Sequence, residues 1–358
     1  MKPIKILTIG PLPPPIGGAT VLFKVLVDAL ARRRDVEVRV LPLPSGRDIR
    51  ISDPWRLLQH VIGLFRYTPQ SDVVSLHCNP TGIHVRAALV SAAARLFGKP
   101  LVIRTFGGQA PREGAGRVTP EQFIRALKRA DLYLGESQHQ VQDAREAGIP
   151  RAEWFPNHRP VPPIGSVGAE NGHDGRRFVF LSHVSAGKGI PELIEAGERF
   201  GSDVRIDVYG PFDEGMTEAV FEGCRQVCYR GVIEPDGVVE VLRQYDALVL
   251  PTSCSTEGYP GIIIEAYSVG LPVISTRLGR LPELVDQSSG ILVEPQNAEA
   301  LYQAIKLLVD DPKRLARLRK GALEKRETYD VEFWSERFVQ LCRETVENRQ
   351  SHGRRKPE

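Results

Sequence analysis

The chain has 358 residues, of which 42% are apolar and 25% are charged, and its formal net charge at pH 7 is +3. These values predict a soluble globular protein of about two domains at ~150 residues each, and they exclude a disordered chain. No apolar stretch reaches the ~18 residues of a membrane-spanning helix, and the N-terminal segment runs straight into a strand and a turn instead of forming a secretory signal. Five scattered cysteines, an odd number, indicate a reducing compartment, so we expect a cytoplasmic protein.

The two halves of the sequence differ in charge. Residues 1–165 contain 23 Lys and Arg against 13 Asp and Glu, whereas residues 166–358 contain 24 against 31. A basic first half is typical of a protein that meets an anionic surface or substrate, although a solvated surface without a partner explains it equally well. We expect no nucleic-acid partner.

The first half alternates strand-like and helix-like stretches. The predicted strands are residues 4–9, 36–43, 72–77, 100–106 and 130–137. The predicted helices are residues 19–31, 55–66 and 83–97, with a further helix that ends at Gly148. Alternation of this kind is typical of βαβ units, whose strands form a parallel sheet.

The same pattern starts again after an irregular stretch that is rich in Pro and Gly. Its predicted strands are residues 177–182, 203–210, 227–232, 246–252, 272–275 and 290–295. Its predicted helices are residues 190–200, 238–245 and 262–269, with another near Glu218. The domains predicted from these patterns are 1–160 and 176–330, joined by a linker over 161–175 and followed by a helix over 331–350 and a mobile tail over 351–358.

The loop after the first predicted strand contains a glycine pair. Gly17 and Gly18 stand in the segment GPLPPPIGGA, directly before a predicted helix. Glycines let the backbone approach a ligand closely, and a helix start offers free N–H groups. A tight strand-to-helix turn explains the pair at least as well.

A lysine lies between two glycines in the first loop of the second half. Lys188 stands in LSHVSAGKGIPEL, after a predicted strand that ends close to His183. A lysine there reaches a phosphate as a mobile point charge, although a lysine in a loop is usually only solvated. Loops after parallel strands open at one sheet edge, where ligands of α/β proteins bind, and this position favours a function for Lys188.

Two glutamates stand eight positions apart in STEGYPGIIIEAYSVGLPVIST, residues 255–276. Glu257 precedes a Tyr-Pro-Gly turn, and Glu265 lies in the first turn of the helix that follows. The amides of Gly261 to Ile263 lie between them and are expected to be unpaired within the helix. Two acceptors on either side of backbone donors suit a ligand with hydroxyls at both ends and negative charge in the middle.

These motifs resemble the family 4 glycosyltransferases, which are retaining and use nucleotide-sugar donors. The stretch 255–276 is similar to their E-x7-E signature, and PIGGA, LSHVSAGKG, YGP, RGVI, DALVLPT and LPELV extend the resemblance over nearly the whole chain. The family has the GT-B fold. The resemblance therefore implies an α/β protein of two facing Rossmann-like domains with a cleft between them, followed by a C-terminal helix.

The resemblance also implies roles for individual residues. Glu265 would hold the ribose hydroxyls of the nucleotide, and Glu257 would bind and orient the donor sugar. Lys188 and the amides after Pro260, those of Gly261 and Ile262, would neutralise the diphosphate. The backbone around Val232 would read the base, and Gly17 and Gly18 would close over the phosphates.

The chain departs from the family pattern at three places. His183 stands where an arginine is common, and Gly279-Arg280 replaces a glycine pair. A family histidine that acts near the reacting sugar has no counterpart in RTFGGQ, for which His77 and Arg104, each at the end of a strand, are weak substitutes.

The resemblance implies no cofactor apart from the nucleotide-sugar co-substrate. No Asp-x-Asp motif is present and Cys224 and Cys228 lack a second ligand pair, so we expect no metal. The expected acceptor is a glycan or a lipid-linked molecule in surface polysaccharide or glycolipid synthesis.

Two alternatives remain open. A glycoside hydrolase would use Glu257 and Glu265 as its two carboxyl groups, but this assignment leaves Lys188 and the glycine loops without a purpose. A non-catalytic GT-B-fold binding protein would keep the fold and lose the activity, and the missing histidine favours this idea.

A membrane partner is a further expectation. The basic first half would bring the protein to an anionic bilayer at the inner face of the membrane as a peripheral protein. The predicted helix 55–66 carries Trp55, Leu58, Ile62 and Phe65 at helical spacing. If all four pack against the sheet, no apolar face remains for lipid.

Overall fold

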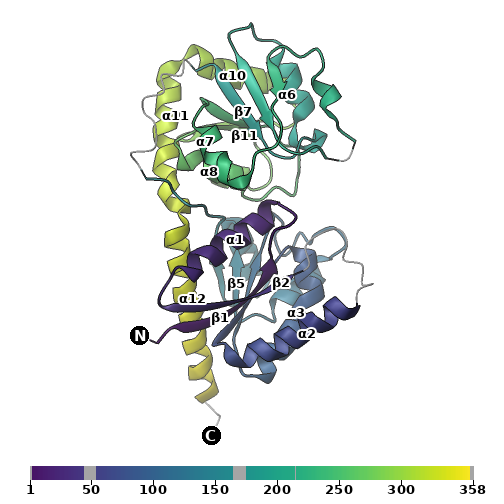
Figure 1. Cartoon of the computed structure of the whole chain (residues 1–358), viewed down its shortest axis with the longest axis vertical. Coiled ribbons are helices and arrows are strands. Elements are labelled where there is room, and N and C mark those ends of the chain that lie inside the picture. The colour runs from purple at the N-terminus through teal and green to yellow at the C-terminus, as the bar shows by residue number, and fades with distance from the viewer. Residues whose placement is uncertain (1, 44–53, 164–174, 214, 355–358) are drawn as a thin grey trace. The chain divides into compact units, whose positions relative to one another are not determined.

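The structure is a computed structural model that describes residues 2–43, 54–163, 175–213 and 215–354. The chain divides into two compact units, the first formed by Met1–His158 with Val331–Glu358 and the second by Arg159–Asp330 (Figure 1). Residues 164–174 of the expected linker and residues 355–358 of the expected tail lie outside the described residues. Each unit is described by itself below.

The first unit contains a six-stranded parallel sheet in the order β2-β1-β3-β4-β5-β6. Its strands are β1 (Ile4–Pro11), β2 (Val36–Leu43), β3 (Val73–Cys78), β4 (Leu101–Thr105), β5 (Leu132–Gly135) and β6 (Ala152–Trp154). Its helices are α1 (Gly18–Ala31), α2 (Pro54–Tyr67), α3 (Pro80–Leu96), α4 (Pro120–Leu127), α5 (Gln138–Glu146) and α12 (Val331–Arg354).

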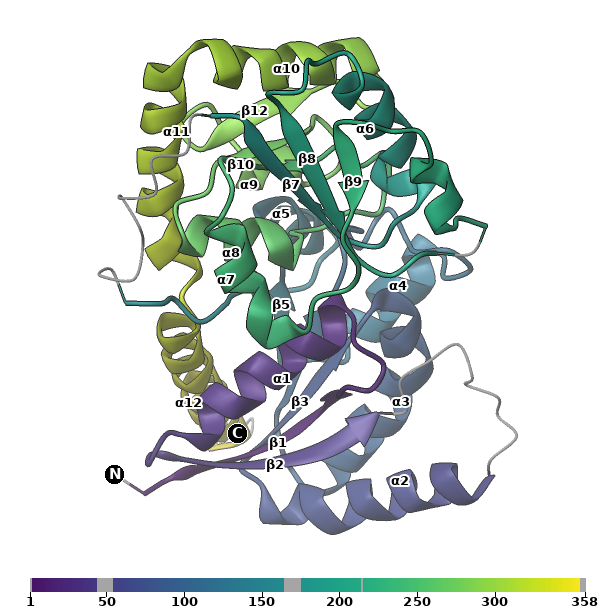
Figure 2. The ribbon, with the colours of Figure 1, turned by 45° about the horizontal axis from the view of Figure 1, so that its top comes forward.

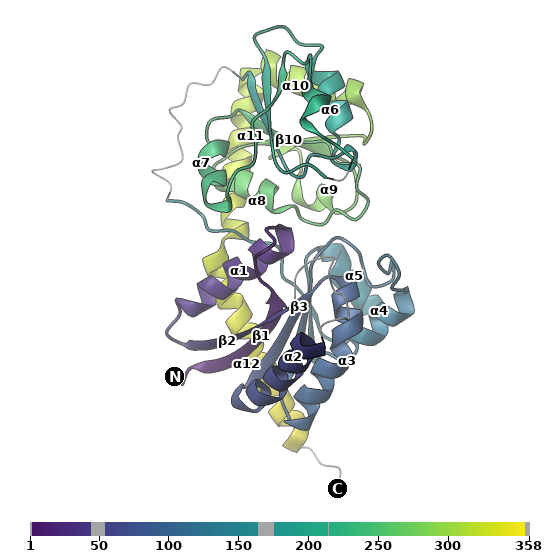
Figure 3. The same ribbon diagram turned by 45° about the vertical axis from the view of Figure 1, so that its right-hand side comes forward.

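Helices cover both faces of the first sheet. Every residue of β3 is buried, as expected for a parallel strand that is covered on two sides. Residues of α1 and α12 pack on one face, and residues of α2, α3, α4 and α5 pack on the other. Figure 3 shows α1 and α12 on one side of this sheet and α2 and α3 on the opposite side.

The last helix of the chain belongs to the first unit. Trp334, Phe338 and Leu341 are spaced four and three residues apart, which places them on one helical face, and all three are buried. They join a cluster that includes Ile6 of β1 and Val102 of β4. The sequence predicts the apolar face of this helix, and the structure shows which sheet it covers.

The second unit contains another six-stranded parallel sheet, in the order β12-β11-β10-β7-β8-β9. Its strands are β7 (Arg177–Leu181), β8 (Arg205–Tyr209), β9 (Val227–Tyr229), β10 (Ala247–Leu250), β11 (Val273–Thr276) and β12 (Gly290–Val293). Its α-helices are α6 (Ile190–Gly197), α7 (Val238–Leu242), α8 (Gly261–Ser268), α9 (Leu281–Leu284), α10 (Ala298–Asp310) and α11 (Pro312–Lys325).

The strand order of the second sheet reverses between β7 and β10. From β7 the chain proceeds outward to β8 and β9, and it then returns to β10 on the other side of β7 before reaching β11 and β12 (Figure 2). At such a reversal the loops that follow the two central strands diverge and leave a crevice, which is where open α/β sheets bind ligands. Two Rossmann-like sheets are therefore present, as the sequence predicts.

Several elements differ from the prediction. The helix expected near Glu218 is only a short 3-10 turn, Glu218–Phe221. The sequence patterns do not predict α4, β6, α10 or α11, which the structure contains.

His77 lies in the interior of the first unit. Its ring packs against Phe23, with ring centroids 5.1 Å apart, and against Phe338, with centroids 5.7 Å apart. Its Nε2 atom lies 2.7 Å from the Ser75 hydroxyl. Arg104 is buried as well, and its Nη2 donates to the backbone carbonyl of Pro156 at 3.1 Å. Because neither side chain is exposed, the structure argues against the weak expectation that one of them contacts the reacting sugar.

Burial of His77 should make the stability of the folded protein depend on pH. Loss of solvation lowers the pKa of His77 well below its usual range, and the nearby charge of Arg104 lowers the pKa further. An unfolded histidine binds a proton near pH 6.5, while the folded protein keeps this ring neutral. The unfolding free energy should therefore fall as the pH drops below ~6.5, by up to about 1.4 kcal/mol per pH unit.

Urea denaturation between pH 5 and pH 8 tests this expectation. His77→Leu removes the titrating group, so its unfolding free energy should depend less on pH below ~6.5 than that of the wild type. The comparison uses slopes, because the substitution also changes packing at every pH. Equal slopes in the two proteins would contradict the assignment.

Candidate functional site

Two loops meet at the strand-order reversal of the second sheet. The loop after β7 carries Lys188, and the loop after β10 carries Glu257. Backbone contacts join the loops, since the amide of Ser253 donates to the carbonyl of Gly187 at 2.9 Å. Gly189 has φ +83°, and a Cβ atom there would lie 2.1 Å from the carbonyl oxygen of Pro251, so only glycine allows this approach.

Lys188 and Glu257 form an ion pair across these loops. The Nζ atom of Lys188 contacts Oε2 of Glu257, and the Thr252 hydroxyl donates to the same oxygen at 3.2 Å. The Lys188 side chain is 22% exposed and the Glu257 side chain 12%, so both charges are largely buried but still reached by solvent. The two residues singled out from separate sequence motifs are therefore direct neighbours.

The amino end of α8 lies between the two glutamates in the sequence. Pro260 precedes the helix, and no acceptor for the amides of Gly261 and Ile262 is seen among the described residues. The amide of Ile263 donates to the carbonyl of Pro260 at 3.1 Å. The expectation of three free amides is thus wrong for Ile263, because the first turn of the helix is tight. The remaining two N–H groups and the helix dipole make this end positive.

Glu265 has a partner that the sequence analysis did not identify. Nε of Arg159 donates to Oε1 of Glu265 at 2.6 Å, and the two side chains are 7% and 17% exposed. A Cβ atom on Gly261 would lie 1.8 Å from Nη2 of Arg159, so the glycine leaves the room that the guanidinium fills. The amide of Arg159 also donates to the carbonyl of Tyr329 at 2.9 Å, which holds this segment in place.

Arg159 lacked a usable signal in the sequence. It stands in an irregular segment rich in Pro, two residues before the expected linker over 161–175, and Glu265 lies 106 positions later. The one clue is a basic residue in an irregular segment, and that clue names no partner.

The second unit therefore presents two cation–carboxylate pairs on either side of one helix start. Lys188 with Glu257 and Arg159 with Glu265 each combine a charged donor with a carboxylate that accepts several hydrogen bonds. This set can bind hydroxyl groups through the carboxylates and phosphate oxygens through the cations and the free amides.

Two other predicted site residues, His183 and Val232, lie outside this group of contacts. His183 lies two residues beyond β7, its side chain is 52% exposed, and Nδ1 is 4.0 Å from Oδ1 of Asp213. Val232 is exposed in the loop after β9. Neither residue is in a contact with Lys188, Glu257 or Glu265 that the structure records.

Gly17 and Gly18 lie at the start of α1 in the first unit. Gly17 has φ −170°, an extended conformation open to any residue, and caps the helix. A Cβ atom built on Gly17 would lie 4.0 Å from the Thr20 hydroxyl, and one built on Gly18 would have no neighbour within 4 Å. Packing and backbone conformation therefore do not require these glycines, and they leave space beside the helix start.

No group of three or more His, Cys, Asp or Glu side chains within the described ranges is arranged to hold a metal ion. In the same ranges, no helix combines the length and the apolar character needed to cross a bilayer.

Residues 175–311 match the family model described as "Glycosyl transferases group 1". These residues are similar to the group 1 glycosyltransferases. The matched region contains both glutamates, Lys188 and the whole of α8, so the family match and the geometry point to the same part of the second unit.

Curated relatives of this group 1 domain cover different shares of the chain. The sulfoquinovosyl transferase of Arabidopsis thaliana is 29% identical over 34% of this chain and 24% of its own length. An N-acetylgalactosaminyltransferase of Campylobacter jejuni is 26% identical over 45% of this chain and 43% of its own length. Alpha-maltose-1-phosphate synthase of Mycolicibacterium smegmatis is 25% identical over 84% of this chain and 89% of its own length. The chain thus spans less than half of the first two relatives and most of the third.

Solved structures match nearly the whole chain. HepE of Anabaena in complex with UDP has a TM-score of 0.73 at 17% identity, covering 96% of this chain and 100% of that one. Sucrose-phosphate synthase of Thermosynechococcus elongatus has a TM-score of 0.75 at 18% identity, covering 95% and 98%. The chain has the GT-B fold. The resemblance noted from the sequence is thus confirmed for the fold, and over residues 175–311 the family model supports it.

The Arg159–Glu265 pair should stabilise the second unit. Removing one partner of a largely buried pair leaves an uncompensated charge, so Arg159→Ala should lower the unfolding free energy by about 3 kcal/mol. A double-mutant cycle with Glu265→Ala, measured by urea denaturation, should give a coupling energy above about 1 kcal/mol.

The exposed pair Arg199–Glu299 provides a matched control in the same unit. Its side chains are 40% and 58% exposed, so its coupling should stay below about 1 kcal/mol. Equal coupling energies in the two cycles would show that Arg159 adds no more than a surface contact.

Proposed function

We propose that the chain is a retaining glycosyltransferase that moves a sugar from a nucleotide-sugar donor to a hydroxyl group of an acceptor. The observation that carries this proposal is the pair of cation–carboxylate contacts beside the amino end of α8, at the strand-order reversal of the second sheet. A nucleotide sugar has hydroxyls on its ribose and on its sugar, with a diphosphate between them. These three parts of the donor match, in order, one carboxylate, the cations and free amides, and the second carboxylate of the site.

Each proposed role follows from the hydrogen-bonding capacity of the group. Glu265 is proposed to accept the ribose hydroxyls and Glu257 the hydroxyls of the donor sugar, since a carboxylate accepts two bonds from a vicinal diol. Lys188 and the amides of Gly261 and Ile262 are proposed to stabilise the charge that develops on the leaving diphosphate. These donors supply positive potential without a metal ion, so we propose turnover that needs none.

The ion pairs in the ligand-free molecule suit this exchange. Each carboxylate neutralises a cation until the donor arrives, and binding then gives both charges new partners. No covalent nucleophile is assigned, so retention would follow from attack on the face of the sugar that the diphosphate leaves. A leaving-group oxygen is proposed to assist removal of the acceptor proton.

The remaining roles in the donor site are also proposals. The backbone around Val232 is proposed to contact the base, and His183 is proposed to donate a hydrogen bond near the phosphates. Gly17 and Gly18 are proposed to give the donor phosphates a close backbone approach, which their open surroundings support.

The partners and pathway rest on the relatives. HepE structures contain UDP or UDP-glucose, one relative is named for an undecaprenol diphosphate acceptor, and another is named for colanic acid biosynthesis. We propose, on this basis, a cytoplasmic enzyme of surface polysaccharide or glycolipid synthesis. A non-catalytic binding protein with the same fold is the competing function.

A panel of UDP-, GDP- and ADP-sugars, assayed for nucleotide release with and without a glycan or lipid-linked acceptor, tests the proposal. One donor should be consumed faster with acceptor, and the wild type should retain activity in EDTA. Lys188→Ala should lower the rate by about 100-fold or more, the loss typical for one electrostatic contact in a transition state.

Glu257→Gln and Glu265→Gln separate the two carboxylate roles. Glu265→Gln should weaken binding of the free nucleotide in calorimetry, whereas Glu257→Gln should keep that affinity and lose turnover. Equal loss of nucleotide affinity would refute the division of roles. Nucleotide binding without transfer to any acceptor would favour the non-catalytic alternative.

Helix α2 supports a membrane role for the first unit. Trp55 is 65% exposed and Ile62 is 55% exposed, and Leu58 and Phe65 on the same face are exposed as well. Leu64 faces inward and joins the core. The alternative that all four residues pack against the sheet is therefore wrong, because the helix presents a different stripe to the interior.

Charge near this face suits an anionic bilayer. The first unit contains 28 Lys and Arg against 18 Asp and Glu, and the second contains 19 against 26. Arg66 and Arg95 are exposed at the ends of α2 and α3, and the rings of Phe65 and Phe97 join these ends at 6.2 Å between centroids. Each basic residue close to such a surface contributes ~1 kcal/mol, while the apolar side chains enter the interface.

Co-sedimentation with phosphatidylglycerol vesicles tests this surface. Wild-type protein should bind at low salt and dissociate at high salt, and Trp55→Ser/Ile62→Ser should bind at least about tenfold more weakly. Val85→Ser, which removes an exposed apolar residue from α3, serves as the control and should bind normally. Absence of wild-type binding at low salt would exclude the membrane role and leave the transferase proposal intact.

A further inference from the structure

A cavity of about 660 Å³ lies at the β12 edge of the second sheet, apart from the donor site. Its lining comes from the segment after β11, from α9 and the turn before β12, from β12 itself and from α11. None of the residues proposed to bind the donor lines it. The volume lies within the range of small-molecule sites, about 300–1,000 Å³.

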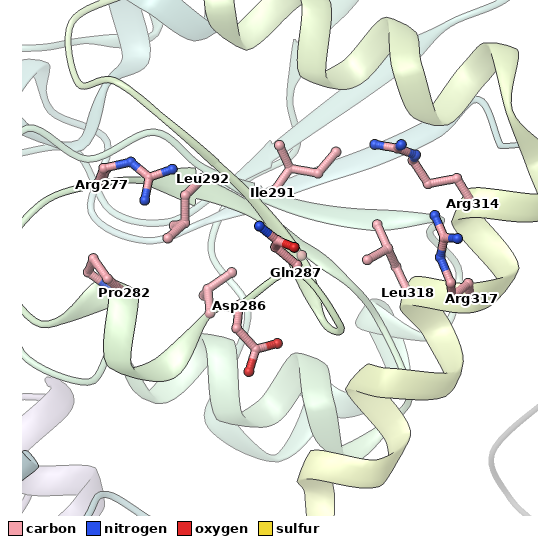
Figure 4. Close-up of a pocket in the computed structure, with 11 residues that line it drawn as sticks. Arg277, Pro282, Asp286, Gln287, Ile291, Leu292, Arg314, Arg317 and Leu318 are labelled. Carbon is pink, nitrogen blue, oxygen red and sulfur yellow. The ribbon is translucent and has the colours of Figure 1, made fainter.

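Three arginines line the cavity: Arg277, Arg314 and Arg317. Figure 4 shows the guanidinium groups of Arg314 and Arg317 on the same side and that of Arg277 on the opposite side, with Leu292 and Gln287 between them. The arginines thus lie at both ends of the cavity, and the lining between them includes Leu318.

These positive charges are only weakly compensated. Nε of Arg277 lies 3.5 Å from Oε1 of Glu294 in a largely exposed pair, and Nε of Arg314 lies 3.9 Å from Oδ2 of Asp311. Nε of Arg314 is inaccessible to solvent and has no hydrogen-bond partner. Arg317 has no recorded ion pair or hydrogen bond in the part of the chain that the structure describes.

The acidic residue of the lining has other partners. Asp286 accepts a hydrogen bond from the Ser288 amide at 2.9 Å, and its Oδ2 lies 2.8 Å from Nζ of Lys325. Burial raises the pKa of Asp286, but the bonds from Lys325 and Ser288 outweigh this effect and lower the pKa to about 2. Figure 4 shows this carboxylate apart from the guanidinium groups of Arg314 and Arg317, and among the described residues it pairs with Lys325 instead of with either arginine.

The cavity also reaches an unpaired strand edge. β12 stands at the end of the sheet order, so one of its sides has no neighbouring strand among the residues that the structure describes. Gly290, Ile291 and Leu292 of this strand line the cavity. Backbone N–H and C=O groups of a free edge can bond a ligand directly.

We propose that this cavity is a binding site for a phosphorylated small molecule. Arg314 and Arg317 bind the phosphate, because the planar guanidinium group matches phosphate oxygens with two parallel N–H donors. The organic part lies over Leu292 and Leu318 and bonds with Gln287 and the β12 edge. The volume exceeds what one inorganic phosphate fills, which favours an organic phosphate.

Chemical labelling of arginines locates the site in the wild-type protein. Phenylglyoxal should modify Arg314 and Arg317 in full-length protein, and inorganic pyrophosphate as the probe should protect both, as read by peptide mass spectrometry. Arg225, an exposed arginine of the same unit outside the cavity, should react equally with and without the probe. Equal modification of Arg314 and Arg317 with and without pyrophosphate would overturn the proposal.

Calorimetry with pyrophosphate measures the contribution of these side chains. Arg314→Gln/Arg317→Gln should weaken the binding by about tenfold or more. Lys313→Gln/Lys320→Gln removes the same charge from the same helix outside the cavity and should change affinity by no more than about twofold.

Lys188→Ala separates this site from the donor site. Because Lys188 does not line the cavity, this variant should keep the pyrophosphate affinity that depends on Arg314 and Arg317. Pyrophosphate binding that is lost in Lys188→Ala and unchanged in Arg314→Gln/Arg317→Gln would assign the probe to the donor site and overturn the inference. Failure of every sugar donor to react would refute the proposed transferase function without affecting protection of the two arginines.

Discussion

The common direction of the strands in the second sheet is the constraint on which the candidate site depends. Because β7 and β10 are neighbouring parallel strands, the loops that follow them begin at the same edge of the sheet. Lys188 and Glu257 are 69 positions apart in the chain and contact each other for this reason. Gly189 completes the arrangement, since any side chain there would push the two loops apart.

The cations of the site are also balanced by carboxylates. A site that is proposed to bind a diphosphate must remain stable without its ligand, because isolated charges that are partly buried are costly. The structure meets this condition by giving Lys188 and Arg159 one carboxylate each. Those same carboxylates are the groups proposed to take the ribose and sugar hydroxyls, so the charges that stabilise the empty site also provide its binding groups.

Much of the fold could be predicted because local patterns report it. Alternating strand and helix patterns predicted most strands of both sheets and the helices α1, α2, α3 and α12 within a few residues. The prediction omitted α10 and α11 and overestimated the helix near Glu218. Two of the three predicted site residues with charged side chains in the second unit, Lys188 and Glu257, proved to be in contact, whereas Glu265 pairs with an arginine that no motif marked.

The sequence by itself determined the fold class, the family and the short list of charged residues, since these depend on local periodicity and on motifs of adjacent residues. Only the tertiary structure decided which residues meet over long distances in the chain, such as Arg159 with Glu265 and the three arginines of the β12 cavity. It also decided that α2 turns Trp55 and Ile62 outward and Leu64 inward. A helical pattern with two apolar stripes permits either orientation, and the packing of α2 on its sheet selects one of them.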